Sequence, residues 1–322
     1  MIDVKGKKIL FIGIGFYDYE KTIKDYLEGL GAKVYYFSSF FNFKKQRLYR
    51  RLGLIEKAIR ISSSAIMSEI VKAPEDINQI IIIKAEDFGQ EHIDALQQKY
   101  PGIKKTLYLW DSLERLHNKD LLLANFDRIL TFDRKDAEKY SLFFRPLFAR
   151  KFRRVAESDI MYDISFVGYM HSTRYEILHQ LKKILDKENI SYKFILSTGK
   201  FNKWFLLNVS HKVANDDKDM LLASQLPYVE YIEILKKSNV ILDISHPRQS
   251  GLTMRTIETL CLGKKLMTTN EDIKNYPFNQ NQYRILTAKF DIDFEFLRNK
   301  SFEESDMSDY SLEKFISDLL TC

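Results

Sequence analysis

The sequence predicts an α/β protein in which two doubly wound parallel sheets form two domains. Three observations lead to this fold class. Apolar strand patterns alternate with amphipathic helix patterns along most of the chain. The alternation breaks once, at the basic and aromatic stretch from 142 to 157, and then restarts. The length of 322 residues also exceeds that of a usual single domain. We therefore expect one domain over 1–157 and a second domain over 158–322.

The first half is expected to contain five strands, each followed by a helix. The first strand is the run KILFIGI at 8–14, and the amphipathic helix that follows at 19–30 ends before Gly31. Because these strands are continuously apolar, we expect a parallel sheet that is covered on both faces. The remaining strands are expected at 33–37, 80–83, 106–110 and 128–132. The remaining helices are expected at 44–72, 90–100, 120–126 and 135–140.

The second half shows the same alternation and predicts a second wound sheet. It begins with a fresh apolar strand at 164–167 and a helix at 175–187. Ligands of such sheets bind beyond the carboxyl ends of the strands, so the loops after the strands are where a site is expected. Further strands are expected at 192–196, 240–243, 265–268 and 283–286. Further helices are expected at 203–210, 218–224, 229–237 and 254–262.

The composition is that of an ordinary globular chain. Hydrophobic residues make up 45% and charged residues 29%, which excludes a disordered or collagen-like protein. Cys261 and Cys322 form neither a zinc-binding spacing nor a disulfide framework, so a reducing compartment is expected. The first residues lack the pattern of a signal peptide, and no apolar run is long enough to span a bilayer. We expect a cytoplasmic protein, soluble or peripheral on the inner membrane face.

Several motifs of known chemistry are missing from the sequence. Gly13 and Gly15 follow the first strand, but the third glycine of a dinucleotide fingerprint would fall at Asp18. The two glycines are thus typical of a tight strand-to-helix turn. The sequence also contains no phosphate-binding P-loop, no G-x-S-x-G and no H-E-x-x-H. The six histidines show no metal-ligand spacing, so we expect no metal and no bound cofactor.

The segment from 240 to 270 is the most informative one. An apolar strand ends at Asp243, a polar loop follows, and Thr253 is placed to cap the next helix. This pattern aims backbone N–H groups, a helix dipole and Arg255 at the edge of the sheet, where they can hold an anion such as a diphosphate. Alternatively, Arg255 and Glu258 are three residues apart and simply pair on one helix.

This segment resembles the donor-binding region of GT-B glycosyltransferases, in particular bacterial enzymes of lipopolysaccharide and capsule synthesis. The resemblance covers roughly 105 to 290, and its implication is two Rossmann-like domains that face a cleft. It rests on the order of Gly251, Arg255, Glu258, Gly263, Lys264-Lys265 and Thr268-Thr269-Asn270, and on the segments at 109–112, 126–127, 131–133, 166–168 and 174–175.

The resemblance implies a nucleotide-sugar donor and assigns it residues. Gly251 and the N–H groups after it, including that of Thr253, would meet the diphosphate. Arg255 would neutralise the charge of the diphosphate, and Glu258 would bind the ribose hydroxyls. The opposing turn would contribute Gly168 and Arg174, with His246 as a further donor contact or a base. The position eight before Glu258 is Ser250, so the E-x7-E pattern of retaining families is not matched.

Inverting sugar transfer needs a base that deprotonates the acceptor hydroxyl. The resemblance places it in the N-terminal domain, at the carboxyl end of a strand. Asp18 and Asp111 are the best placed carboxylates, followed by Asp87. For each of them the alternative is a helix cap or a solvated loop residue. The enzyme would act on a saccharide or a lipid-linked saccharide. A GT-B nucleotide-sugar epimerase and a catalytically silent saccharide-binding or assembly protein are the alternatives.

The net charge of +6 is concentrated in two segments. The segment 41–60 has a net charge of +6, 143–155 carries five cations and no acid, and the rest of the chain is net acidic. Aromatic and leucine side chains lie between these cations, as in segments that bind an anionic membrane surface. The alternative is a solvated basic helix whose apolar side faces the core. No nucleic-acid-binding signature accompanies the charge, so nucleic acid is not an expected partner.

Overall fold

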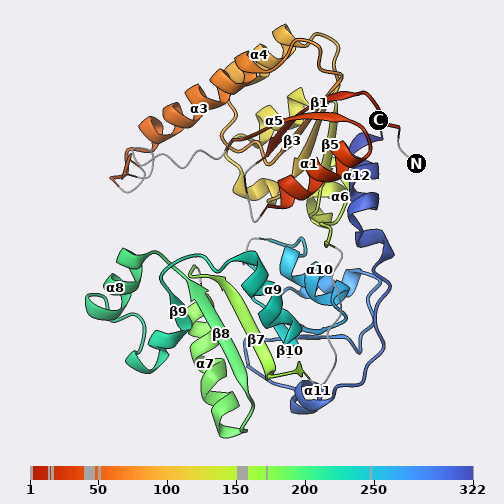
Figure 1. The fold of residues 1–322 in the computed structure, drawn as a ribbon. Helices are drawn as coiled ribbons and strands as arrows, with labels where there is room; N and C mark the ends of the chain where they lie inside the picture. Colours follow the sequence, from red (N-terminus) through yellow and green to blue (C-terminus); the bar gives the residue numbers. More distant parts are fainter. Residues whose placement is uncertain are drawn as a thin grey trace. The chain divides into compact units, whose positions relative to one another are not determined.

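The protein is described by a computed structural model that covers 3–13, 15, 18–39, 48–49, 52–150, 159–171, 173–246 and 249–321. Its contacts divide the chain into two compact units, each built on its own sheet (Figure 1). The first unit comprises Met1–Pro146, Arg248–Gly251 and Leu312–Cys322. The second unit comprises Leu147–Pro247 and Leu252–Ser311. The predicted α/β class with two wound sheets is confirmed.

The first unit contains a six-stranded parallel sheet with the strand order β2-β1-β3-β4-β5-β6. Its strands are β1 (Lys8–Gly13), β2 (Lys33–Ser38), β3 (Gln79–Ile83), β4 (Lys105–Leu109), β5 (Arg128–Thr131) and β6 (Phe143–Phe144). Its helices are α1 (Tyr19–Gly29), α3 (Ile55–Lys72), α4 (Gln90–Lys99), α5 (Lys119–Asn125), α6 (Arg134–Tyr140) and α12 (Leu312–Leu320).

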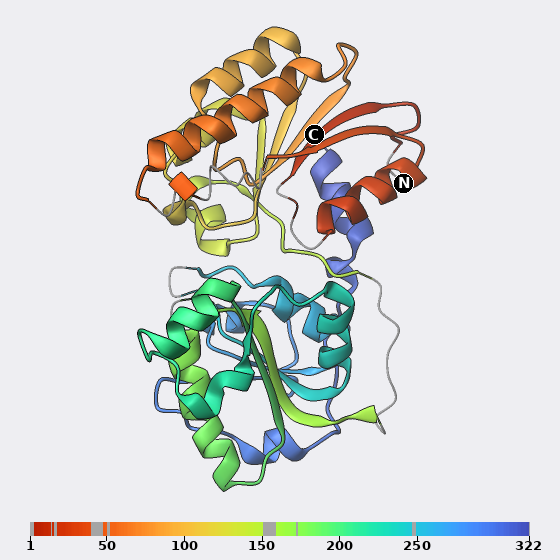
Figure 2. The same ribbon diagram turned by 60° about the vertical axis from the view of Figure 1, so that its left-hand side comes forward.

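The side chains of β4 show how this sheet is covered on both faces. Leu107 and Leu109 belong to a buried cluster that includes residues of α3 and α4. Tyr108 lies between them in the sequence, so its side chain points to the opposite face. There its ring contacts Phe315 of α12, with 4.8 Å between the ring centroids. Helices α3 and α4 thus cover one face, and α1 and α12 lie on the other (Figures 1 and 2).

The second unit contains another six-stranded parallel sheet, with the order β12-β11-β10-β7-β8-β9. Its strands are β7 (Tyr162–Tyr169), β8 (Tyr192–Ser197), β9 (Leu221–Leu222), β10 (Ser238–Asp243), β11 (Lys265–Thr268) and β12 (Tyr283–Ile285). Its helices are α7 (Arg174–Lys187), α8 (Lys200–Asn208), α9 (Tyr228–Lys236), α10 (Met254–Cys261) and α11 (Phe294–Arg298).

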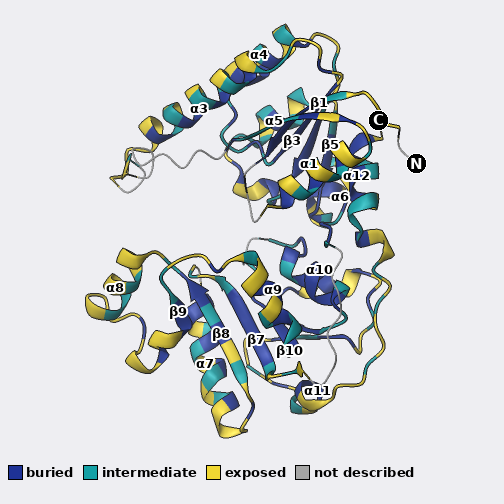
Figure 3. Cartoon of the chain, in the orientation of Figure 1, coloured by how far each residue is buried: buried dark blue, intermediate teal, exposed yellow. Residues whose placement is uncertain are grey.

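Neighbouring residues of β7 again face opposite layers. Phe166 packs in a cluster with apolar residues of α7 and α11, whereas Val167 packs with residues of α9. The central strands are therefore buried on both faces, as their continuous apolar patterns predict. Figure 3 shows the sheets in the buried colour and most outward helix faces in the exposed colour.

Two sequence predictions need correction. The helix expected at 218–224 is wrong, because a short 3-10 segment at Asn215–Met220 leads into the strand β9. Leu221 and Leu222 form a strand instead of a helix because they pair with β8 at the edge of the sheet, with Leu221 opposite Leu196. The long helix expected at 44–72 is described as α3 only from Ile55 onward, and 41–47 lies outside the described residues. Helices α11 and α12 were not expected at all.

The division between the units also differs from the expected boundary after residue 157. The first unit ends at Pro146, and α12 returns to it at the end of the chain. Arg145 holds α12 there, because its buried guanidinium pairs with Asp318 at 2.9 Å. Long-range contacts of this kind leave no periodic signal in a sequence. Residues 151–158, which include most cations of the second basic segment, lie outside the described residues.

Candidate functional site

The sheet of the second unit reverses its strand order between β7 and β10, which lie side by side. The connections that leave β7 and those that leave β10 run toward opposite edges of the sheet. In open parallel sheets, ligands bind beyond the carboxyl ends of the strands at such a point. Gly168 lies near the end of β7, and Asp243 is the last residue of β10. The candidate functional site of this unit therefore lies beyond these two strand ends.

Asp243 is fully buried at the end of β10, and three side chains donate to its carboxylate. Oδ1 pairs with Nη1 of Arg255 at 2.7 Å, and Oδ2 accepts from the hydroxyls of Thr253 at 2.9 Å and Thr256 at 2.8 Å. Thr253 Oγ1 also accepts from the backbone N–H of Thr256, so the predicted helix cap is confirmed. One buried carboxylate thus fixes the start of α10 on the end of β10.

Arg255 reaches from α10 across to β7. Its Nη2 donates to the carbonyl oxygen of Val167, and its guanidinium lies 4.6 Å from the ring centroid of Phe166. A Cβ at position 168 would come within 3.0 Å of this Nη2, so Gly168 leaves the space that the guanidinium needs. The ion pair of Arg255 is with Asp243, which is not the pairing with Glu258 that its helix spacing allowed.

Arg174 brings a second guanidinium to the same place. Its Nη2 donates to the carbonyl oxygen of Ile244 at 2.9 Å, its Nη1 donates to that of Tyr169 at 3.1 Å, and the side chain is almost fully buried. Burial and the nearby guanidinium of Arg255 lower the pKa of Arg174 to about 9, although Asp243 acts in the opposite direction. Two arginines and one carboxylate leave a surplus positive charge, which a phosphate group can neutralise.

Glu258 is also buried, on the inner side of α10. Its two carboxylate oxygens accept from the hydroxyls of Tyr228 at 2.7 Å and Tyr231 at 2.9 Å. Burial and the carboxylate of Glu258 raise the pKa of Tyr231 well above its usual value, so this hydroxyl stays a donor. Both tyrosines lie on α9 and were missed by the sequence analysis. The role of Glu258 in binding ribose stays a prediction.

His246 follows β10, as predicted, and a second histidine lies near it. The ring centroids of His246 and His171 are 6.1 Å apart, and His171 follows β7. The sequence analysis missed His171 because it considered this histidine only for metal-ligand spacing. Position after a strand at the switch point is the signal that could have identified it. The two rings are potential hydrogen-bonding groups for an anion at the candidate site.

Gly251 belongs by its contacts to the first unit, where its backbone N–H donates to a carboxylate. Asp133, the N-cap of α6, accepts this hydrogen bond at 3.2 Å and another from the hydroxyl of Ser250. The hydroxyl of Ser112 donates to the same carboxylate. A Cβ at position 251 would lie 2.5 Å from the ring of Phe132, so only glycine fits. The backbone N–H of Gly251 thus already donates to a carboxylate, and the role of Gly251 in meeting a donor diphosphate stays a prediction.

In the first unit, Asp18 opens onto a pocket of about 360 Å³. Asp18 precedes α1 with a left-handed φ of 58°, and its carboxylate accepts no capping hydrogen bond from the described residues of that helix. Burial and the carboxylate of Glu20 raise the pKa of Tyr36 in the same pocket to about 12. The lining residues are Gly15, Asp18, Glu20, Lys21, Lys24, Asp25 and Tyr36. Asp18 is therefore available to a polar ligand of this pocket.

Asp111, the other predicted base, has two cationic partners. Its carboxylate pairs with Lys84 at 2.9 Å and with Arg115 one helical turn further along. Burial lowers the pKa of Lys84, but Asp111 and Glu86 outweigh it, so the pKa is raised. The carboxylate of Asp111 is therefore already engaged by two cations. Asp87 is half-buried in the loop after β3. Asp18 and Asp111 thus differ in their surroundings, because Asp18 lines a pocket and Asp111 is held in ion pairs.

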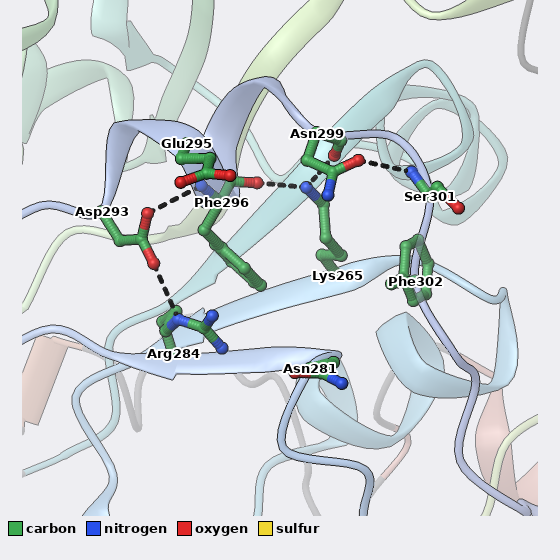
Figure 4. A pocket seen from close by; sticks show the side chains of 9 residues that line it. All are labelled: Lys265, Asn281, Arg284, Asp293, Glu295, Phe296, Asn299, Ser301 and Phe302. Atoms are coloured by element: carbon green, nitrogen blue, oxygen red, sulfur yellow. Dashed lines mark hydrogen bonds and ion pairs between the residues drawn. The ribbon is translucent and has the colours of Figure 1, made fainter.

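A pocket of about 330 Å³ in the second unit is lined by groups that hold α11 (Figure 4). At one end of α11, Asp293 accepts from the N–H of Phe296 and pairs with Arg284 at 3.0 Å. At the other end, the buried ammonium of Lys265 donates to the carbonyl oxygens of Phe296 and Asn299. A cation at this position caps the last carbonyl groups of a helix. The polar groups that line this pocket therefore hold both ends of α11 in place.

Lys265 predicts a specific pH dependence of stability. Burial and Arg284 lower its pKa to about 8, whereas the unfolded value is about 10.4. The folded state therefore binds fewer protons between these values, so stability rises as the pH increases from about 8 to about 10.4. We expect the wild type to gain on the order of 3 kcal/mol over this range relative to Lys265→Met. Urea unfolding at several pH values measures this gain in stability. Lys274→Met is the control, because Lys274 belongs to an exposed ion pair.

Stability that changes with pH in the same way in the wild type and in Lys265→Met would contradict the prediction.

The described residues contain neither a metal-binding cluster nor a membrane-spanning helix. No group of three or more histidine, cysteine, aspartate or glutamate side chains in the described part of the chain could hold a metal ion. Among the same residues, no helix is long and apolar enough to cross a membrane.

No family model and no curated protein matches the sequence. Solved structures do match. OtsA in its apo form has a TM-score of 0.62 and 11% identity, covering 98% of this chain and 100% of that chain. MnaA from S. aureus, in a co-structure with UDP, has a TM-score of 0.58 and 13% identity, covering 97% and 94%. A glycosyltransferase from Rickettsia africae has a TM-score of 0.55 and 12% identity, covering 98% and 93%. At these identities the likeness concerns the fold, and the chain has the GT-B fold that was predicted.

Proposed function

We propose that this protein is a glycosyltransferase that uses a nucleotide-sugar donor. The observation that carries the proposal is the presence of two buried guanidinium groups at the switch point between β7 and β10, of which Arg255 pairs with Asp243 and Arg174 donates to backbone carbonyl oxygens. A diphosphate is an anion of the right kind for two guanidinium groups at this place. The GT-B fold supports the proposal, and so does the UDP bound to MnaA in its co-structure.

In the proposed reaction, an acceptor hydroxyl attacks the anomeric carbon of the donor sugar. The new glycosidic C–O bond forms as the bond between the sugar and the diphosphate breaks, and the nucleoside diphosphate leaves with the bonding electrons. Arg174 and Arg255 stabilise its negative charge, with the positive end of the α10 dipole. A carboxylate takes the proton of the acceptor hydroxyl.

We propose Asp18 as the base in preference to Asp111. Asp18 lines a pocket in which its carboxylate does not cap the described helix, whereas Asp111 is paired with Lys84 and Arg115. The proposed acceptor is a saccharide or a lipid-linked saccharide of a cell-surface polysaccharide. The basic segments at 41–60 and 143–155 would attach the enzyme to the anionic membrane face that carries such an acceptor.

Nucleotide binding to an arginine variant tests the proposed donor site. Thermal shifts with UDP, GDP, CMP and dTDP identify the nucleotide that stabilises the wild type. Arg174→Gln keeps a donor for the carbonyl oxygen of Ile244 but removes the charge, and we expect at least a tenfold loss of affinity.

The matched control is Arg284→Gln, which removes an arginine of the same unit that pairs with Asp293. It should leave nucleotide affinity unchanged. Equal affinities of wild type and Arg174→Gln, or no stabilisation by any of the nucleotides, would overturn the donor site. Product analysis then tests the reaction: an isomerised nucleotide-sugar in the absence of acceptor identifies an epimerase. Nucleotide binding without turnover identifies a silent GT-B protein, in which Asp18→Asn changes no product.

A further inference from the structure

Helix α8 exposes apolar side chains on every turn. All its residues are described, and none of them is buried. Five of its nine residues are nevertheless aromatic or leucine. Figure 1 shows α8 beside the edge strand β9 of the second unit, and Figure 3 colours it as exposed or intermediate. A helix of this length is marginal in water and normally depends on burying an apolar face. Helix α8 buries part of its apolar surface, because Leu206 and Leu207 pack against the core of the second unit, but its aromatic side chains stay exposed.

Three aromatic side chains of α8 and that of Val209, the residue directly after the helix, are exposed on one side. Phe201, Trp204, Phe205 and Val209, here called the α8 patch, are exposed by 59%, 55%, 42% and 49%. Their spacing of three, four and eight residues places them on one helix face. The ring centroid of Phe201 lies 6.1 Å from that of Trp204 and 6.4 Å from that of Phe205. The rings thus form a cluster at the surface.

The charges around the α8 patch identify the chemistry of its partner. From residue 189 to residue 215 the sequence contains four lysines and no acidic residue. Lys200 lies beside Phe201 and is exposed. The ammonium of Lys203 instead donates to the carbonyl oxygen of Leu221 at 2.6 Å, and Lys212 pairs with Glu176 at 3.7 Å. Tryptophan and phenylalanine flanked by lysine are the residues that favour the interface between lipid headgroups and acyl chains. Lysine near that surface adds attraction to anionic headgroups.

We propose that the α8 patch inserts into the surface of a lipid bilayer that contains anionic headgroups. The helix lies in the interface with its aromatic face in the acyl-chain boundary and the exposed Lys200 at the headgroups. Such binding needs no membrane-spanning helix, and none of the described helices is one. The inference depends neither on the proposed sugar transfer nor on the basic segments at 41–60 and 143–155, because α8 belongs to neither segment.

Vesicle binding by the full chain tests the proposal. Vesicles are prepared from phosphatidylcholine alone and from three parts phosphatidylcholine with one part phosphatidylglycerol. We expect the wild type to sediment with the mixed vesicles and to bind the neutral ones less. A triple variant, Phe201→Ser, Trp204→Ser and Phe205→Ser, should lose at least tenfold in its partition coefficient. Lys200→Glu should weaken binding to the mixed vesicles only. These side chains are exposed, so the variants are expected to fold.

Val229→Ser is the matched control, because Val229 is 73% exposed on α9 of the same unit and lies outside the α8 patch. Its binding should equal that of the wild type. Lipids brominated on their acyl chains should quench the fluorescence of Trp204, and the quenching should disappear in Trp204→Phe. The proposal is overturned if the triple variant binds as the wild type does, since binding then lies elsewhere. It is also overturned if the wild type binds no vesicles; a dimer that the triple variant abolishes would then identify a second copy of the chain as the partner of the α8 patch.

Discussion

Replacing Asp243 by alanine is expected to lower the free energy of unfolding by about 3–5 kcal/mol. The carboxylate is fully buried and is the ion-pair partner of Arg255, whose side chain is only 12% exposed. Its removal leaves a buried guanidinium without its counter-ion and two threonine hydroxyls without their acceptor. A loss of stability of this size is expected when one member of a buried ion pair is removed, because the remaining charge stays buried without a counter-ion.

Urea unfolding at neutral pH measures this effect. Asp243→Asn keeps the volume and one acceptor oxygen, so it should lie between alanine and the wild type. The control is Glu233→Gln, which removes a half-exposed ion pair with Lys236 in the same unit and should change stability by less than about 1 kcal/mol. If Asp243→Ala is no less stable than this control, Asp243 does not hold α10 in the way described.

The second large effect is expected at Asp133. Its buried carboxylate caps α6 and accepts from Ser112, Ser250 and Gly251. Asp133→Asn should lower the free energy of unfolding by about 3 kcal/mol at neutral pH, because several hydrogen bonds to a charged acceptor are weakened together. Burial raises the pKa of Asp133, but the hydrogen bonds from Ser112, Ser250 and Gly251 outweigh burial, so the pKa is lowered.

The sign of the pH dependence follows from this lowered pKa. The carboxylate stabilises the folded state above its unfolded pKa of about 3.9, and this contribution is lost as the pH falls through the folded value. The difference between wild type and Asp133→Asn should therefore shrink below about pH 4. Unfolding measured from pH 7 to acid tests it, with the exposed Asp120→Asn of the same unit as control. A difference that stays constant in acid would contradict the assignment.

The residues that the GT-B resemblance identified are only part of the arrangement around them. Gly168, Arg174 and Arg255 do lie together at the switch point of the second sheet, as their positions after strands predicted. Asp243, which joins Arg255 to α10, had been noted only as the end of a strand. The tyrosines that donate to Glu258 lie on a different helix, 30 and 27 residues earlier in the chain, and their aromatic pattern is that of any core helix.

The sequence by itself determined the elements and the fold class. Apolar runs predicted the central strands, and the helix periods and caps predicted most helices, because these signals arise among residues that are neighbours in the chain. Thr253 as the cap of α10 is the clearest example at the site. Two exposed aromatic residues of α8, Trp204 and Phe205, lie in the helix expected at 203–210, whereas Phe201 lies before its expected start.

Only the tertiary structure decided which polar and charged groups bind one another. The return of α12 to the first unit, the cap that Lys265 provides for α11 and the contact of Gly251 with Asp133 all join residues that are far apart in sequence. The same holds for the lowered pKa of Arg174, which depends on burial and on a second guanidinium. Such properties arise from distances in space, and a local pattern of residues carries no information about those distances.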